Sequence, residues 1–222
     1  MLVAQNLHKY YGQLHVLKGI DLHIETGKIT TIVGPSGAGK STLLHILGTL
    51  DKPDKGSLTA EGINLLTLNE KELARFRNLT IGFVFQFHNL LPEFTALENI
   101  AMPGYIAGKS TDELHQRAIM LAEKLGVAHR LSHKPAELSG GEQQRIAVAR
   151  ALINSPTIVF ADEPTGNLDT RNAEELHNLF FKLRDELNQT FVIVTHNEAL
   201  ANATDRKITI IDGRIADDSK QG

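Results

Sequence analysis

The octet Leu138–Arg145, LSGGEQQR, combines two features that suit the binding of an anion. Ser139 is a favoured N-cap residue, and apolar residues recur at helical spacing after it, so we expect a helix to begin here. The start of a helix presents free N–H donors and the positive end of the helix dipole. Because Gly140 and Gly141 carry no side chain, a bulky anion could approach this backbone closely. The octet therefore predicts phosphate-binding chemistry.

A second phosphate-binding pattern occurs earlier in the chain. The run GPSGAGKS matches G-x-x-x-x-G-K-[ST], follows a predicted strand at Ile29–Val33 and precedes a predicted helix at Thr42–Gly48. Lys40 would contact the β- and γ-phosphates, and the Ser41 hydroxyl would ligate magnesium. The backbone N–H groups of the loop would surround the phosphates. The residues expected to bind the nucleotide here are Gly34, Pro35, Ser36, Gly37, Ala38, Gly39, Lys40, Ser41 and Thr42.

Two carboxylates follow the apolar run Thr157–Ala161, which predicts a strand. In a parallel sheet the carboxyl ends of the strands line the ligand crevice. Asp162 is therefore placed to hold magnesium, directly or through water, and Glu163 to polarise the attacking water as a general base. On its own, such a pair is also typical of a solvated strand end.

Two further polar residues follow predicted strands. Gln86 comes directly after the predicted strand Ile81–Phe85, and His196 comes directly after the predicted strand Phe191–Thr195. The neutral amide of Gln86 could bind magnesium or position water, and a histidine at position 196 could reach a γ-phosphate. From the residues alone, a polar strand cap remains an alternative for Gln86, and a turn histidine is the commoner explanation of His196.

The elements that position these residues indicate an α/β fold, because strand and helix patterns alternate along the chain. Extended N-terminal segments at Leu2–Leu7 and Val16–Ile24 predict an antiparallel part beside a mainly parallel sheet. A predicted strand at Ile208–Ile211 turns at Asp212-Gly213 into Arg214–Ala216. The residues from 217 to 222 are predicted to form a frayed polar tail.

The region 87–154 contains no convincing strand, and a helical pattern runs from Ser110 to about Gly126. We therefore expect one domain, with a core formed by residues 1–86 and 155–222 and an inserted helical lobe formed by 87–154. A further helix is predicted at Asn172–Leu187.

The composition narrows the function classes. The chain has 222 residues, a net charge of −3 and no cysteine. The charge gives no reason to expect nucleic-acid binding, and the absence of cysteine excludes disulfides and thiolate metal sites. The longest apolar stretches are too short for a membrane span, and the N-terminus has no secretory pattern.

The motifs occur in one order: the phosphate loop, Gln86, the octet, Asp162-Glu163, Asn167–Asp169 and His196. This order and spacing closely resemble the nucleotide-binding subunits of ABC transporters over essentially the whole chain. The resemblance implies a P-loop ATPase that uses ATP and Mg²⁺. It implies that Gln86 belongs to the loop that senses the membrane subunit and that His196 is the switch histidine. It also implies that Asp169 links two nucleotide sites.

The resemblance further implies how ATP is bound. Tyr11, with Tyr10 as the alternative, would stack on the adenine. Two copies would pair head to tail, and the octet of one copy would cover the ATP held by the phosphate loop of the other. The octet residues implied to contact that ATP are Ser139, Gly140, Gly141 and Glu142.

Within the family, the segment Phe85–Asn99 resembles ATPases of lipoprotein-releasing systems. This likeness implies integral membrane permease subunits that dock near that segment and handle a lipoprotein cargo. It also implies a location at the cytoplasmic face of the bacterial inner membrane. A MacB-type exporter and a regulatory ATPase of a cell-division complex remain alternatives, and core–lobe packing remains an alternative use for the segment.

Overall fold

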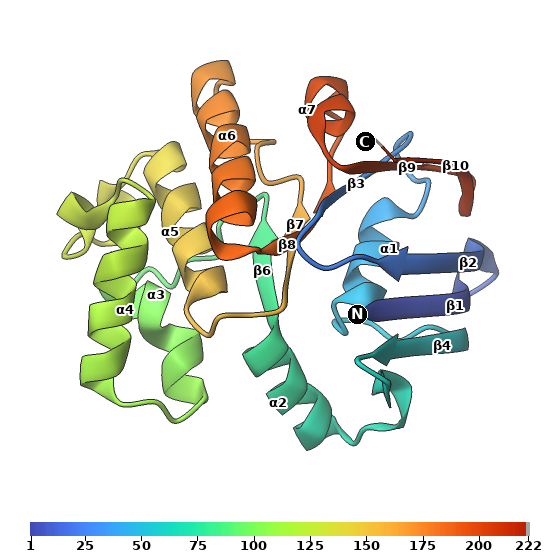
Figure 1. Cartoon of the computed structure of the whole chain (residues 1–222), viewed down its shortest axis with the longest axis horizontal. Coiled ribbons are helices and arrows are strands. Elements are labelled where there is room, and N and C mark those ends of the chain that lie inside the picture. Colours follow the sequence, from blue (N-terminus) through green and yellow to red (C-terminus); the bar gives the residue numbers. More distant parts are fainter. Residues whose placement is uncertain (221–222) are drawn as a thin grey trace. The chain divides into compact units, whose positions relative to one another are not determined.

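The computed structural model describes residues 1–220, which form two compact units. The first unit contains residues 1–74 and 184–220, and the second contains residues 75–183 (Figure 1). Both units combine strands with helices, so the predicted α/β class is confirmed.

The first unit contains an antiparallel sheet in the order β2-β1-β4-β5. Its strands are β1 (Leu2–Tyr11), β2 (Leu14–Ile24), β4 (Lys55–Ala60) and β5 (Ile63–Asn64). A 3₁₀ turn, η1 (Leu65–Thr67), follows β5. The sheet confirms the predicted antiparallel N-terminal part. β1 continues beyond the predicted end at Leu7, so Tyr11 is the last residue of a strand.

The first unit also contains parallel strands. β3 (Ile29–Val33) pairs in parallel with β8 (Thr190–Val194) and β9 (Arg206–Ile211), and β9 pairs antiparallel with β10 (Arg214–Lys220). Every residue of β3 and β8 is buried, including Thr30, Thr31 and Thr190, as is typical of parallel strands. Helices α1 (Lys40–Leu47) and α7 (Glu198–Ala203) contact β8 and β3, respectively.

The polar tail predicted from residue 217 is wrong for residues 217–220. These residues belong to β10 and pair with β9, and Asp218 accepts hydrogen bonds of 2.7 and 2.6 Å from the Arg206 guanidinium. Polar side chains are compatible with an exposed edge strand, so their polarity did not signal the absence of structure. The rest of the predicted tail lies outside the described residues.

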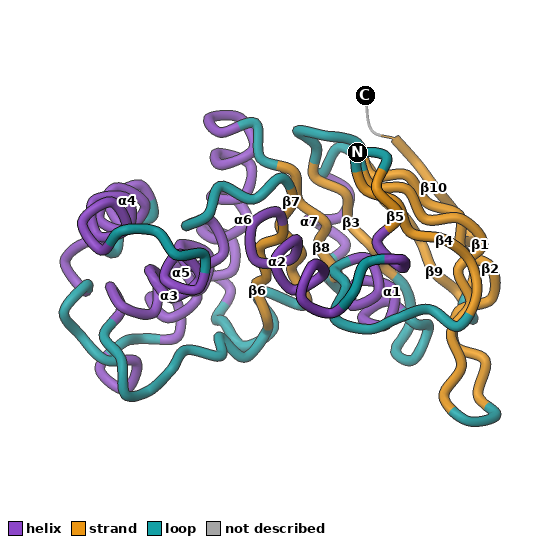
Figure 2. The backbone as a smooth tube through the Cα atoms, turned by 90° about the horizontal axis from the view of Figure 1, so that it is seen from below, coloured by secondary structure: helices purple, strands orange, loops and turns teal. Residues whose placement is uncertain are grey.

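In the second unit, β6 (Ile81–Phe85) and β7 (Ile158–Asp162) pair in parallel. Helices supply most of this unit, as Figure 2 shows. They are α3 (Ala96–Ile106), α4 (Thr111–Lys124), α5 (Gly140–Leu152) and α6 (Thr170–Leu187) as far as Leu183. α2 (Glu70–Thr80) leads into β6, and the 3₁₀ turns are η2 (Ala128–Arg130) and η3 (Pro135–Glu137). Residues 87–154 form helices and no strand, as predicted. The core and lobe boundaries drawn at 86/87 and 154/155 remain a prediction.

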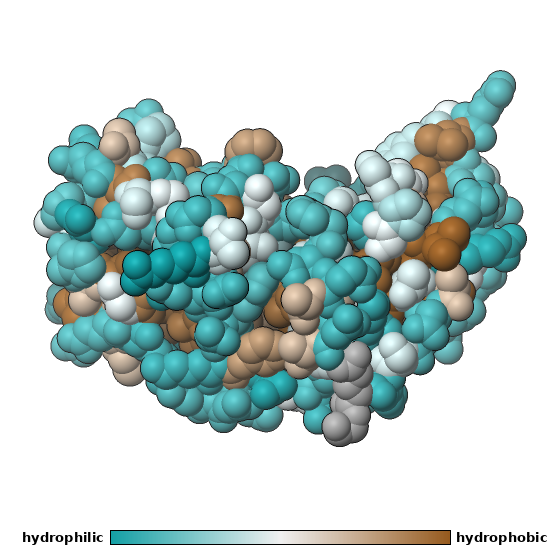
Figure 3. Space-filling view, turned by 90° about the horizontal axis from the view of Figure 1, so that it is seen from above, coloured by the Kyte–Doolittle hydropathy of each residue, from teal (hydrophilic) through white to brown (hydrophobic). Residues whose placement is uncertain are grey.

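The helices bury apolar side chains inside the units. In α4, Leu114, Ala118 and Leu121 are at most 4% exposed. No helix within residues 1–220 is both long and apolar enough to cross a bilayer. The face drawn in Figure 3 is mostly hydrophilic, with apolar side chains visible between the hydrophilic ones.

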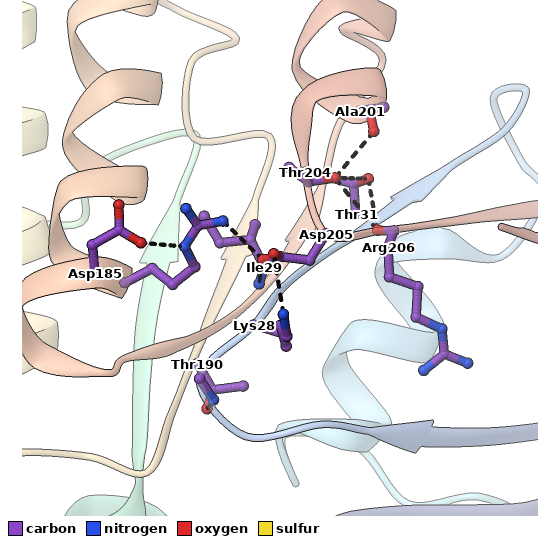
Figure 4. A network of polar contacts seen from close by, with 11 residues as sticks. Lys28, Ile29, Thr31, Asp185, Thr190, Ala201, Thr204, Asp205 and Arg206 are labelled. Atoms are coloured by element: carbon purple, nitrogen blue, oxygen red, sulfur yellow. Dashed lines mark hydrogen bonds and ion pairs between the residues drawn. The ribbon is translucent and has the colours of Figure 1, made fainter. Parts of the chain in front are cut away.

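A polar network fixes the start of β3 in the first unit (Figure 4). The Asp205 carboxylate accepts a hydrogen bond of 2.8 Å from the Ile29 amide and one of 3.0 Å from the Arg184 guanidinium. The Lys28 ammonium lies 3.6 Å from the same carboxylate. Burial tends to raise the pKa of Asp205, but these hydrogen bonds and charges lower it below its ordinary value. The ionised carboxylate therefore stabilises the strand that leads into the phosphate loop.

Replacing this carboxylate should destabilise the first unit. We expect Asp205→Asn to lower the free energy of unfolding at pH 7 by about 1–3 kcal/mol, because buried donors lose a charged acceptor. Because the folded-state pKa is depressed, the contribution is present above the ordinary pKa of about 3.9 and is lost as pH falls through the lower folded value. Urea denaturation at pH 7 and at lower pH would measure both effects.

The matched control is Asp217→Asn, which removes an exposed carboxylate from β10. It should change the free energy of unfolding by no more than about 0.5 kcal/mol. Equal losses from the two substitutions, or a difference that grows as the pH falls, would contradict the structural role assigned to Asp205.

Candidate functional site

The phosphate loop of the first unit connects β3 to α1. Gly34 has a φ of +144°, and a Cβ placed on it would lie 2.0 Å from the Ile210 carbonyl oxygen, so the position admits only glycine. The Lys40 ammonium donates to the carbonyl oxygens of Gly34 at 2.9 Å and Pro35 at 3.0 Å. Ser41 is exposed in the first turn of α1. The loop, the start of α1 and the Lys40 ammonium therefore lie together, which is the arrangement that a phosphate site needs.

His196 lies near this loop in the first unit. It follows β8, which pairs in parallel with β3, and the Thr195 amide donates to the Ile32 carbonyl oxygen at 3.2 Å. The phosphate loop begins directly after β3. His196 is exposed at that same end of the two strands. A histidine there is positioned to contact a ligand of the loop.

The two tyrosines proposed as adenine contacts have different surroundings. The Tyr10 ring stacks on His15, with ring centroids 4.1 Å apart and planes inclined by 11°. Tyr11 is 52% exposed, and its hydroxyl donates a hydrogen bond of 2.8 Å to Asp51, whose amide donates to the His45 carbonyl oxygen of α1 at 3.2 Å. Tyr11 is therefore the tyrosine that is connected to the phosphate-loop helix.

In the second unit, the carboxyl ends of β6 and β7 bring three of the predicted residues together. The register pairs Phe85 with Asp162, so Gln86 and Glu163 follow at adjacent strand ends. Glu163 has a φ of +46°, in the left-handed region that a non-glycine residue rarely adopts. Gln86 Nε2 donates to the Asn167 side-chain oxygen at 3.1 Å. Asn167 Nδ2 in turn donates to the Gln86 carbonyl oxygen at 3.1 Å.

The octet begins α5, as predicted, with Ser139 as its N-cap. Ser139 and Glu142 form a capping box: the Glu142 carboxylate accepts from the Ser139 amide and hydroxyl, each at 2.8 Å. Arg130 Nε donates to the same carboxylate at 2.7 Å. The Ser139 amide and the Arg130 guanidinium lower the pKa of Glu142 to about 2. In this chain Glu142 shapes the helix start, and its contact with nucleotide remains a prediction.

The octet packs closely against the first turn of α6. A Cβ on Gly141 would lie 2.6 Å from the Asn172 side-chain oxygen, so any other residue would displace that side chain. Asp169 accepts hydrogen bonds of 2.9 and 2.6 Å from the Asn172 amide and side chain. Asp169 therefore ends the loop next to the octet in the second unit.

Side chains of α5 also hold the two strand ends. Gln144 is fully buried, and its Nε2 donates to the carbonyl oxygens of Phe85 at 3.3 Å and Pro164 at 2.7 Å. Arg150 donates to the carbonyl oxygens of His88 at 2.7 Å and Asn89 at 2.6 Å.

Sequence reasoning assigned no role to Gln144 or Arg150, nor to Arg130. The helical spacing placed Gln144 and Arg150 on α5 but could not indicate which distant carbonyl groups they reach.

The predicted magnesium ligands offer only oxygen donors. They are the Ser41 hydroxyl in the first unit, and the Gln86 amide and Asp162 carboxylate in the second. Within residues 1–220 no group of three or more histidine, cysteine, aspartate or glutamate side chains is arranged so that it could hold a metal ion. Mg²⁺ in phosphate sites needs only one or two carboxylates together with hydroxyl, water and phosphate oxygens, so this donor chemistry fits magnesium.

Comparison with known proteins was consistent with this geometry. A family model described as ABC transporter matches residues 17–166. The chain is 59% identical over 218 residues to the lipoprotein-releasing system ATP-binding protein LolD of Bacteroides thetaiotaomicron. That match covers 98% of this chain and 100% of the relative.

Solved structures with the same fold include the dimeric bacterial ABC transporter cassette MJ0796, which is 40% identical with a TM-score of 0.91. A second structure of that cassette, in a post-hydrolysis state bound to ADP and Pi, is 39% identical with a TM-score of 0.91. Both matches cover 100% of each chain. Because the family model spans more than half of the chain and the relatives match it at full length, this chain belongs to the ABC transporter family, as an ATP-hydrolysing subunit.

Proposed function

We propose that this ABC ATPase powers the release of lipoproteins from the bacterial inner membrane. It works at the cytoplasmic face of that membrane, bound to permease subunits of the LolC/LolE type that handle the cargo. The observation that carries the proposal is the full-length identity of 59% with a protein named as the ATP-binding component of a lipoprotein-releasing system.

ATP is proposed to bind at the phosphate loop of the first unit. The backbone of Gly34–Thr42 surrounds the phosphates, and the Lys40 ammonium, now hydrogen-bonded to loop carbonyls, contacts the β- and γ-phosphates. Ser41, Gln86 and Asp162 hold Mg²⁺, which when bound neutralises charge on the β- and γ-phosphate oxygens. The oxygen-only chemistry of these side chains supports this set.

Glu163 is proposed as the general base, with His196 contacting the γ-phosphate and Gln86 helping to place the water. The φ of +46° at Glu163 supports its role, because residues held in this region are concentrated at functional sites. The backbone just after it is fixed through the Pro164 carbonyl, which accepts from the buried Gln144 side chain. A carboxylate on such a fixed turn can take a proton from water at a constant position.

The octet is proposed to bind the ATP held by a second copy of this chain. Two features support binding in trans: the octet forms an N-capped helix start that contains two glycines, and the same unit contains Asp169 beside it. The similarity to a cassette solved as a dimer also supports this arrangement. A homodimer would then contain two complete sites, and hydrolysis in them would reopen the dimer.

The permease is proposed to dock on the segment Phe85–Asn99. Three of its large apolar side chains are exposed, Phe87 at 70%, Leu91 at 40% and Phe94 at 37%. The buried Asn99 side chain fixes the backbone, accepting from the Leu91 amide at 2.7 Å and donating to carbonyl oxygens of the segment. A rigid segment with an exposed aromatic side chain suits an apolar helix of the partner.

Phe87→Ser should separate ATP binding from transport. In proteoliposomes with LolC/LolE-like subunits, we expect the wild-type chain to release lipoprotein in an ATP-dependent manner. The variant should lose release by at least about tenfold, because a buried aromatic anchor at an interface contributes about 2 kcal/mol or more. The isolated variant should bind ATP as the wild type does. Release into solution and ATP affinity are the measurements.

Ile106→Ser is the matched control, because Ile106 is 72% exposed at the end of α3 and lies outside the docking segment. It should retain release.

ATP hydrolysis by the wild-type complex without any lipoprotein release would contradict the cargo assignment. Neighbouring genes for a permease with a large periplasmic stalk domain would favour MacB-type export instead. Filamentous cells on depletion, with lipoproteins correctly located, would favour the cell-division role.

A further inference from the structure

The hydroxyl group of Tyr11 is held by Asp51 in the first unit. It donates a hydrogen bond of 2.8 Å to Asp51 Oδ2. Tyr11 is nevertheless 52% exposed, so its ring is anchored at one end without being buried. An aromatic side chain that is fixed yet accessible is suited to stack on a planar group.

Asp51 is itself tightly fixed. Its Oδ1 accepts from the Lys9 ammonium at 2.7 Å and from the Lys52 amide at 2.7 Å. The Lys9 ammonium, which belongs to a residue only 9% exposed, also donates to the Lys52 carbonyl oxygen at 2.7 Å. Because both oxygens of the Asp51 carboxylate are used, the carboxylate cannot rotate without losing charged hydrogen bonds.

Lys9 also contacts the Tyr11 ring directly. Its ammonium lies 5.2 Å from the ring centroid, within the range of a cation–π interaction. A cation over one face of the ring occupies that face and leaves the opposite face for a second planar group. Lys9, Asp51 and Tyr11 therefore form one unit, which we call the tyrosine clamp.

The tyrosine clamp is connected to the helix of the phosphate loop. The amide of Asp51 donates to the carbonyl oxygen of His45, a residue of α1, at 3.2 Å. α1 begins at Lys40, directly after the phosphate loop. The position of the Tyr11 ring is therefore tied to the phosphate loop through a helix only two turns long.

We propose that Asp51 is a positioning residue for nucleobase binding: it holds the Tyr11 ring at a fixed place relative to the phosphate loop, with Lys9 on one face and the base on the other. This inference rests on the proposed function, because it takes Tyr11 as the adenine contact. Asp51 itself does not touch the nucleotide. Its effect is to remove the freedom of the ring before ATP binds, so that less freedom is lost on binding.

The test compares ATP with magnesium tripolyphosphate, a probe that has the phosphates but no base. Isothermal titration calorimetry gives the ratio of the two affinities for each variant. Asp51→Ala should lower this ratio by about fivefold, the size expected when one stacking contact is lost. Tripolyphosphate affinity should stay within about twofold of the wild type, because the phosphate loop is unchanged.

A double-variant comparison separates positioning from general damage. Tyr11→Ala should lower the ratio at least as much as Asp51→Ala, and adding Asp51→Ala to it should lower the ratio no further. Tyr11→Phe keeps the ring and removes the hydroxyl, so it should reproduce part of the loss. Asp51→Asn keeps the shape of the side chain and provides a second variant if Asp51→Ala fails to fold.

Asp54→Ala is the matched control in the same loop. The Asp54 carboxylate accepts from the Tyr10 amide at 2.6 Å and does not contact the Tyr11 hydroxyl, so its loss should leave the ratio unchanged. The inference is overturned if Asp51→Ala leaves the ratio unchanged, lowers both affinities equally, or still acts in the Tyr11→Ala background. A wild-type chain that binds neither ATP nor tripolyphosphate would instead overturn the proposed function.

Discussion

Glu163→Gln should lower the rate of ATP hydrolysis by about 10²–10⁴-fold while ATP affinity stays close to that of the wild type. Glutamine has nearly the same shape as glutamate but cannot accept a proton from the attacking water. The phosphate loop, which lies in the other unit, keeps all of its residues. Phosphate release at saturating ATP measures the rate, and calorimetry measures the affinity.

The same variant should accumulate an ATP-bound dimer, because hydrolysis is the step that reopens the proposed sandwich. Size-exclusion chromatography with and without ATP would detect the change in mass. Glu174→Gln, which changes an exposed glutamate on α6, is the control and should hydrolyse ATP at the wild-type rate. A hydrolysis rate for Glu163→Gln within about tenfold of the wild type would contradict the general-base role.

Lys40→Ala should weaken ATP binding itself by about 10–100-fold. The substitution removes an ammonium group that would form charge-assisted hydrogen bonds to the phosphates, and such bonds contribute about 1.5–3 kcal/mol. The ammonium already lies over the loop, at 2.9 Å from the Gly34 carbonyl oxygen and 3.0 Å from that of Pro35. Calorimetric titration with ATP and magnesium is the direct measurement.

Lys71→Ala is the control for the loss of one positive charge, since Lys71 is exposed on α2. Its ATP affinity should match that of the wild type. The contrast with Glu163→Gln is diagnostic: one variant should bind ATP without hydrolysing it, and the other should fail at binding. If Lys40→Ala bound ATP as tightly as the wild type, the phosphate loop would not be the nucleotide site.

Elements with strong local signals were predicted well. The strands at Ile29–Val33 and Ile81–Phe85 have the predicted bounds, and α5 begins where the N-cap pattern placed it. The strands around residues 158 and 191 are displaced by one residue from the predicted bounds. Such small displacements are expected, because pairing with a neighbouring strand decides which terminal residue is included.

Elements with weak local signals were missed. α2 is mostly polar and buries none of its residues completely, so it does not stand out in the sequence as a core-facing helix. α3 contains Pro103, which normally argues against a helix, although Thr95 and Glu98 cap its start. β4 begins with lysine and glycine and becomes a strand through its pairing with β1. In each case tertiary contacts outweighed the local preference.

The sequence by itself determined the two phosphate-binding segments and the order of the residues beside them. Phosphates are bound by contiguous backbone amides at helix starts, so the chemistry is encoded in short runs such as the octet and the phosphate loop. The tertiary structure decided which distant groups support those runs: Asp51 with Lys9 beside Tyr11, Arg130 on Glu142, and Gln144 and Arg150 on the strand ends. These contacts join segments far apart in the chain, and no spacing rule in a sequence specifies them.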